Sequence, residues 1–161
     1  MKHPLVKSLN LAPHEEGGYY REVFKSSRSM ETGRPGGRRP LCSTIYYLLT
    51  ADSRTGHLHR NNSDITHFFH MGAPMKYTLI SPAGELSAFT MGSNVDEGEQ
   101  LQYTVPAGYW KASVLEKGDY GLISEVVVPG FDWRDMTIAS MVDIENAFPH
   151  LLSKVKHLIR N

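Results

Sequence analysis

The feature that most constrains the fold is a series of short apolar and aromatic segments, separated by turn residues, between residues 41 and 142. Turn chemistry rich in Pro and Gly stands at residues 81–84, 106–108, 116–119 and 129–130. Strands are therefore predicted at residues 41–50, 56–60, 64–71, 75–81, 85–91, 100–105, 110–115, 120–128 and 136–142. Many short strands without β-α alternation favour an all-β sandwich, jelly roll or barrel and argue against a doubly wound nucleotide fold.

The segments on either side of this region have other patterns. Residues 3–10 are predicted to form a short helix, and residues 17–24 a strand rich in aromatic and branched side chains. Residues 25–40 hold Gly, Pro and Arg without apolar periodicity and are predicted to be a mobile surface loop. Apolar residues at helical spacing predict one C-terminal helix over residues 146–159. We expect a single domain over residues 1–161, with the barrel at about 17–142.

Composition excludes several classes of partner. Lys plus Arg and Asp plus Glu are 17 each, so the net charge is zero and neither nucleic acid nor a membrane surface is an expected partner. The single Cys42 cannot form an intramolecular disulfide. The first residues lack the apolar run of a signal peptide, and no stretch approaches the roughly 20 apolar residues of a membrane span. These features predict a cytoplasmic protein.

Four of the eight histidines fall between residues 57 and 70. Side chains two positions apart on a strand share a face, so His57 and His59 are predicted to point into the same space. With Asp64 on the next strand, this pattern is one that holds a divalent transition metal. The alternative is a polar pocket in which these side chains hydrogen-bond to one another.

These residues also carry a resemblance. The spacing His57-x-His59-x4-Asp64-x7-Gly72, followed by residues 98–111, resembles the two motifs of the cupin superfamily. More closely, the chain is similar to the Cupin 5 family, also called the domain of unknown function 985. The matching segments are residues 11–22, 44–49, 59–64, 105–110 and 128–132. The resemblance implies a double-stranded β-helix, the jelly-roll barrel, with a ligand or metal inside and a homodimer as the assembly.

Two departures from the cupin motifs bear on the metal. Asp64 stands where the general motif has a Glu ligand, and Lys111 stands where it has its last His ligand. A protonated lysine has no lone pair to offer a metal. The hypothesis of a bound metal therefore depends on His57 and His59 as ligands. The preferred hypothesis is a site without a cofactor.

The metal-free reading follows a resemblance to the sugar-nucleotide epimerases of the superfamily, which use a His base and a Tyr acid. It implies His59 as the base, oriented by Asp64, with Tyr46 or Tyr103 as the acid. Cationic, acceptor and aromatic side chains are expected to bind the ligand. These candidates are Glu16, Arg21, Arg60, Phe68, His70, Gln102, Trp110, Lys111, Glu125 and Phe131.

Three functional hypotheses follow. The first is a small-molecule-binding barrel with isomerase or epimerase activity on a sugar or a carboxylated metabolite. The second is a metal-dependent enzyme using His57 and His59, and the third is a barrel that only binds or assembles. A homodimer is expected in each case, because the strand at residues 18–24 can pair with the sheet edge of a second copy.

Overall fold

The computed structural model describes residues 2–160 and consists mainly of strands, which confirms the all-β prediction. The strands are β1 (Ala12–Pro13), β2 (Tyr19–Lys25), β3 (Ser29–Glu31), β4 (Arg38–Pro40), β5 (Ser43–Thr50), β6 (Thr55–Asn61), β7 (Asp64–Gly72), β8 (Met75–Ile80), β9 (Leu86–Met91), β10 (Gln102–Val105), β11 (Trp110–Val114), β12 (Tyr120–Val128) and β13 (Met136–Ile138). The α-helices are α1 (Pro4–Ser8), α2 (Met141–Ala147) and α3 (Leu152–Val155).

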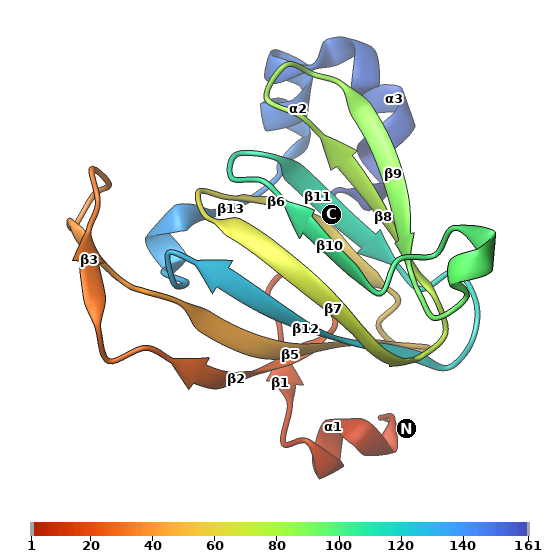
Figure 1. Ribbon diagram of the computed structural model, residues 1–161. Coiled ribbons are helices and arrows are strands. Elements are labelled where there is room, and N and C mark those ends of the chain that lie inside the picture. Colours follow the sequence, from red (N-terminus) through yellow and green to blue (C-terminus); the bar gives the residue numbers. More distant parts are fainter. Residues whose placement is uncertain (1, 161) are drawn as a thin grey trace.

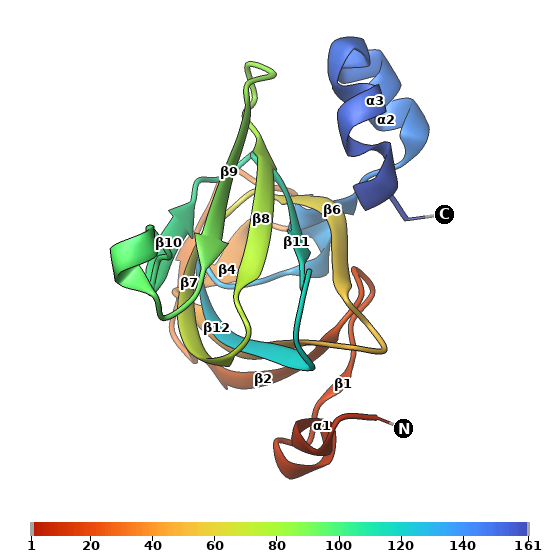
Figure 2. The same cartoon turned by 90° about the vertical axis from the view of Figure 1, so that its right-hand side faces the viewer.

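Two antiparallel sheets face each other across a common interior (Figures 1 and 2). The first has the strand order β1-β2-β5-β12-β7-β10, and the second has the order β13-β6-β11-β8-β9. Alternation then divides each strand between the interior and an outer face. Tyr47, Leu49, Tyr77, Leu79 and Ile123 belong to the apolar core inside.

Helices cover part of each outer face (Figure 2). The C-terminal segment packs on the second sheet, where Leu58, Trp110 and Ala112 meet Leu151 and Leu158. The N-terminal helix α1 packs on the first sheet through a separate apolar cluster. The side of a strand that faces out is therefore apolar wherever a helix covers it, and burial alone does not mark the interior.

The C-terminal helix differs from its prediction. Helix α2 begins at Met141, because Ser140 and Asp143 form a reciprocal capping box at its start. It ends at Ala147, since Pro149 disfavours helical geometry at Phe148, whose φ and ψ are −143° and 60°. Short 3-10 turns and α3 follow, so the single helix predicted over 146–159 is wrong, and the strand predicted over 136–142 is shortened to β13.

The segment predicted as a mobile loop is an ordered hairpin. Strands β3 and β4 pair with each other, and the Arg39 side chain is fully buried, at 0% exposure. Its guanidinium donates to both carboxylate oxygens of Asp135, with Nε–Oδ2 at 2.8 Å and Nη2–Oδ1 at 2.9 Å. Arg34 also donates to Asp135, at 3.0 Å. The prediction was wrong because the partner that orders the hairpin lies 96 residues from Arg39 along the chain.

The outer edge of β2 remains available for pairing. Strand β1 pairs only with Tyr19 and Tyr20, and the following residues Val23 and Phe24 are about half exposed, at 49% and 53%. The expected homodimer through this strand stays a prediction. None of the helices formed by residues 2–160 is long and apolar enough to cross a membrane.

Candidate functional site

A cavity of about 350 Å³ opens into the space between the two sheets. Both sheets, the loop before β2 and the segment after β12 contribute to its wall. The lining residues are His14, Glu16, Tyr20, Glu22, Lys25, Ile45, His59, Asn61, Ile65, Glu125, Val127, Phe131, Asp132, Trp133 and Met136. Of the predicted site residues, the structure brings Glu16, His59, Glu125 and Phe131 together here.

The first polar group at the cavity is an ion pair between Glu16 and His59. His59 Nε2 lies 2.9 Å from Glu16 Oε2, and the two side chains are 5% and 7% exposed. Burial is the largest single influence and would raise the pKa of Glu16, but the charges of His59, His14 and Lys111 and the hydrogen bond with His59 together lower it to about 2. Glu16 is therefore a buried carboxylate held in its charged form.

The hydrogen bonds of His59 define where its protons are. Its Nδ1 lies 2.7 Å from the His57 carbonyl oxygen, which can only accept, so Nδ1 carries a proton. Its Nε2 faces the ionised Glu16 carboxylate, which also accepts. The pair therefore holds one proton between Nε2 and Oε2 in addition to the proton on Nδ1. This arrangement makes His59 an imidazolium when Glu16 is charged.

The second polar group joins the two sheets through Lys111. Lys111 lies opposite His59 in the pair β11–β6, and Glu125 lies opposite His67 in the pair β12–β7. The Lys111 ammonium donates to Glu125 Oε1 at 3.0 Å and to His67 Nε2 at 2.7 Å. Burial, followed by the Lys111 charge, lowers the pKa of His67, which leaves its ring neutral. Lys111 and His67 likewise hold the pKa of Glu125 well below its usual range, against the effect of burial.

His57 does not share the cavity with His59, so the predicted common face is wrong. The register of β6 against β11 shifts between Lys111 and Ser113, where two residues of β6 face one residue of β11. Such a bulge interrupts the alternation of side chains. The His57 ring instead lies 3.3 Å from the Leu158 carbonyl oxygen, in the C-terminal segment that packs on the outer face.

The other predicted partners of His59 also lie elsewhere. Asp64 is exposed and accepts a hydrogen bond from the Ala107 backbone N–H at 2.8 Å, so it does not orient His59. Arg60 lies over the Trp110 ring, at 4.7 Å, and Trp110 belongs to the cluster beneath the C-terminal helices. Both neighbours of an inward residue point outward on a regular strand, which explains why Arg60 leaves the cavity when His59 enters it.

Several candidates share the outer face of the first sheet. Arg21 lies over the Tyr46 ring, and the Tyr46 ring lies 6.0 Å from the His70 ring. His70 bonds to Ser124. Gln102 and Ser124 each pair in register with Phe68, which places all three on one face. Because adjacent strand residues point to opposite faces, Glu125 points inward when Ser124 points outward. The alternation of the sequence could therefore have shown that the residues on the Ser124 face do not share the cavity with Glu125.

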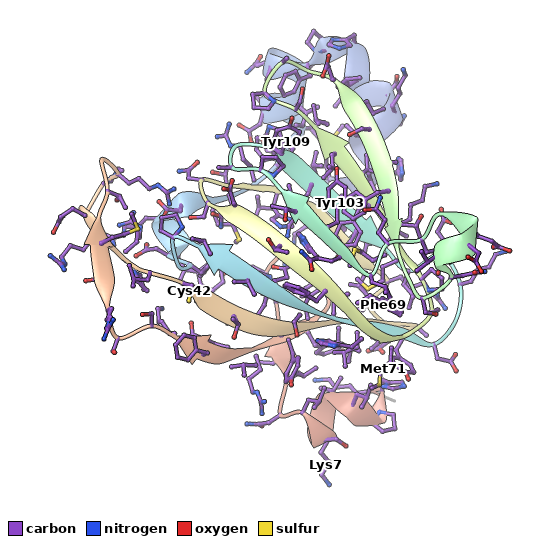
Figure 3. The ribbon with its side chains drawn as sticks, viewed as in Figure 1. Lys7, Cys42, Phe69, Met71, Tyr103 and Tyr109 are labelled. Atoms are coloured by element: carbon purple, nitrogen blue, oxygen red, sulfur yellow. The ribbon has the colours of Figure 1, made fainter. Side chains whose placement is uncertain are left out.

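Tyr103 faces the interior but does not line the cavity. It lies opposite His67 and stacks on Phe89 at 3.7 Å between ring centroids, against the apolar core. Tyr103 is labelled on strand β10 in Figure 3. The tyrosine at the cavity is Tyr20, which packs edge-on to His14. Tyr20, His14 and Trp133 were not proposed from the sequence. Tyr20 could have been predicted from the sequence, because it lies two positions before Glu22 on β2 and so shares a face with it.

The donors around the cavity do not form the metal site expected from His57 and His59. His57 is turned to the Leu158 carbonyl, and His67 and Glu125 are already bonded to an ammonium. Within residues 2–160, no three His, Cys, Asp or Glu side chains form a metal-binding group. A resident divalent metal therefore does not fit the side chains as they stand.

Acid unfolding is expected to depend on Glu16. Its folded pKa of about 2 lies below the ordinary value of 4.5. The stability it contributes is therefore complete above pH 4.5 and is lost as the pH falls toward 2, because the unfolded chain binds the proton first. Denaturant titrations across this pH window should show a shallower loss of stability in Glu16→Gln. The exposed neighbour Glu15 provides the control, and equal slopes in Glu15→Gln and Glu16→Gln would contradict this assignment.

Comparisons with known proteins agree with this architecture. The uncharacterized protein YML079W of Saccharomyces cerevisiae is 39% identical to this chain over 168 residues, covering 96% of this chain and 78% of that protein. A hypothetical protein from Leishmania major superposes with a TM-score of 0.90 at 34% identity, covering 98% of this chain and 97% of that one. Protein SO0799 from Shewanella oneidensis gives 0.85 at 31% identity, covering 99% of both chains.

A more distant likeness extends to an enzyme of known structure. Oxalate decarboxylase from Bacillus subtilis gives a TM-score of 0.56 at 17% identity, covering 91% of this chain and 36% of that one. At this identity the likeness shows the fold alone, and it confirms the expected jelly roll. The profile of the family described as "Cupin superfamily (DUF985)" matches residues 3–139. This chain therefore belongs to that cupin family, as the spacing of its motifs predicted.

Proposed function

We propose that the protein is an acid–base enzyme that isomerises or epimerises a small hydroxylated carbonyl compound without a metal. The observation that carries this proposal is the buried pair of Glu16 and His59, which holds one proton at the wall of a ligand-sized cavity. Buried titratable pairs in clefts are where proton transfer is concentrated in enzymes. The size of the cavity suits a ligand of monosaccharide size.

The positions of the protons in this pair make His59 the general acid and Glu16 the general base. His59 Nε2–H gives its proton to the substrate carbonyl oxygen, while a Glu16 oxygen takes the proton from the adjacent carbon. The substrate becomes an enediol, and the pair passes from imidazolium and carboxylate to neutral imidazole and carboxylic acid. Return of the protons at the other carbon or the other face completes the reaction. The pair stays neutral overall, so no net charge is created in a buried site.

In this scheme His59 acts as the acid, whereas the family resemblance implied that it acts as the base. An imidazolium with both nitrogens protonated has no lone pair to act as a base. Glu16 becomes a stronger base once His59 has given up its proton, because the imidazolium that contributes most to lowering its pKa is then neutral. The His57 carbonyl keeps Nδ1–H in place and so keeps Nε2 as the atom that exchanges protons.

The cavity wall favours a neutral polyhydroxylated ligand over a carboxylated one. Glu16, Glu125 and Asn61 offer oxygen acceptors, and Phe131 and Trp133 offer aromatic faces 4.9 Å apart between centroids. The two arginines expected to bind an anion stack on tyrosine and tryptophan rings outside the cavity. Lys25 is at the cavity but pairs with Glu22 at 3.5 Å. Hydroxyl groups match such a wall better than a carboxylate does.

Deuterium exchange tests the proposal on a panel of compounds, so the natural substrate need not be identified first. The protein is incubated in D₂O with neutral ketoses, aldoses and hydroxyketones, and deuterium on carbon is measured by mass spectrometry. At least one compound should gain deuterium next to its carbonyl. His59→Asn and Glu16→Gln should slow that exchange roughly 10²–10⁴-fold, the usual contribution of a positioned acid or base.

His57→Asn is the matched control, because the His57 side chain, two residues before His59 in the sequence, lies outside the cavity. It should retain the exchange rate of the unmodified protein. Equal losses in His57→Asn and His59→Asn would contradict the assignment of the pair. Binding of a panel compound without any exchange would leave a binding pocket and remove the enzymatic proposal.

A further inference from the structure

The cluster of Lys111, His67 and Glu125 is not used by the proton transfer proposed for Glu16 and His59. All three side chains are nearly buried, at 4%, 0% and 8% exposure. His67 Nδ1 faces the Tyr103 carbonyl oxygen at 3.3 Å and so carries the ring proton. Its Nε2 therefore presents a lone pair to the Lys111 ammonium, 2.7 Å away, and lies 3.1 Å from Glu125 Oε1, the other acceptor of that ammonium.

The two acceptors around this ammonium are of the kind that divalent metals use. A neutral imidazole nitrogen and a carboxylate oxygen form a common mixed donor set for zinc, cobalt and related ions. Here both converge on one point, and the cation at that point is the lysine ammonium. Glu125 also lines the cavity, so the cation acts directly on the wall that a ligand meets.

We propose that Lys111 is a built-in cation that occupies the position of a divalent metal and keeps Glu125 as a charged acceptor at the cavity. A covalently attached cation cannot dissociate, so the site needs no metal supply. It also repels an added metal ion, because two cations a few ångströms apart in a buried site interact unfavourably. This inference goes beyond the proposed function, since a metal-binding measurement tests it without any substrate.

Metal binding by the variant Lys111→His tests the proposal. An imidazole reaches roughly 2 Å less far than a lysine arm, which is about one metal–nitrogen bond. The variant therefore offers two imidazoles and Glu125 to an ion placed where Nζ was. Co²⁺ is added to the tag-free protein, and its visible d–d absorption reports the number of nitrogen and oxygen ligands.

We expect no Co²⁺ bands in the unmodified protein and one equivalent of bound Co²⁺ in Lys111→His. Loss of an outer-shell partner changes metal affinity roughly 10–100-fold, so gaining a ligand while losing a cation should tighten binding by at least about 100-fold. Adding Glu125→Gln to Lys111→His should remove the bands. Lys117→His places the same ring on an exposed turn and should remain without them.

Two results of the Co²⁺ measurements would overturn the inference. One is stoichiometric Co²⁺ binding by the unmodified protein that disappears in His67→Ala, because the donors would then be free for a metal. The other is a folded Lys111→His variant that binds no Co²⁺. If Lys111→His does not fold, side-chain ¹⁵N NMR of the unmodified protein decides. A slowly exchanging –NH₃⁺ signal from Lys111 supports the proposal, and a neutral amine refutes it.

Discussion

Replacing Lys111 with methionine is expected to destabilise the fold by about 3–5 kcal/mol, the cost of breaking a buried ion pair by removing one partner. Methionine keeps the apolar length of the side chain but leaves Glu125 charged and buried without its cation. For a chain of this size, such a loss lowers the melting temperature by roughly 6–20 °C. Denaturant and thermal unfolding monitored by circular dichroism measure both quantities.

The double variant Lys111→Met/Glu125→Leu separates the charge from the packing. Replacing both partners by apolar groups is often neutral, so this variant should recover most of the lost stability. Lys117→Met, on an exposed turn, should change stability by less than about 0.5 kcal/mol. A Lys111→Met protein as stable as Lys117→Met would mean that the ammonium does not hold Glu125 in its charged state.

Replacing Arg39 with methionine is expected to cause the second large loss, at least about 6 °C in melting temperature, because Asp135 loses a bidentate buried partner. The same change should weaken ligand binding at the cavity. Asp135 anchors the segment that carries Phe131, Trp133 and Met136, all of which line the cavity. Thermal melting and ligand titration of the same protein preparation test both effects.

The neighbouring Arg38 supplies the control. Its ion pair with Glu31 is exposed, at 62% and 68%, and exposed pairs contribute little to stability. Arg38→Met should therefore melt within about 2 °C of the unmodified protein, given a surface contribution near zero. Comparable losses in Arg38→Met and Arg39→Met would show that the hairpin is held by its turn and not by Asp135.

Strand positions could be predicted from the sequence because they depend on local patterns. The turn residues at 81–84 and 106–108 separate strands at the predicted places, and His59, which alternation predicted to point inward, lines the cavity. The same rule failed at His57, because a bulge in β6 changes the phase of alternation. The residues around the bulge do not indicate its position in the sequence.

The partners of the inward residues could not be predicted in this way. Asp64, the acidic residue of the cupin-like motif, was expected to orient His59, whereas Glu16, from the loop before β2, does so. Glu16 and Asp64 are both acidic side chains on turn-rich segments, and sequence alone does not rank them. The choice is made by the pairing of β2 with β5, which brings the loop before β2 to the cavity.

By itself, the sequence determined the all-β class, the family and the strands that carry the polar side chains, because strand periodicity and turn chemistry act over a few residues. Only the tertiary structure decided which charges neutralise each other. Lys111 meets His67 across 44 residues, and Arg39 meets Asp135 across 96. Such contacts depend on sheet pairing and a bulge, and these are settled when the whole chain packs, since a buried charge is stable only where a partner is brought to it.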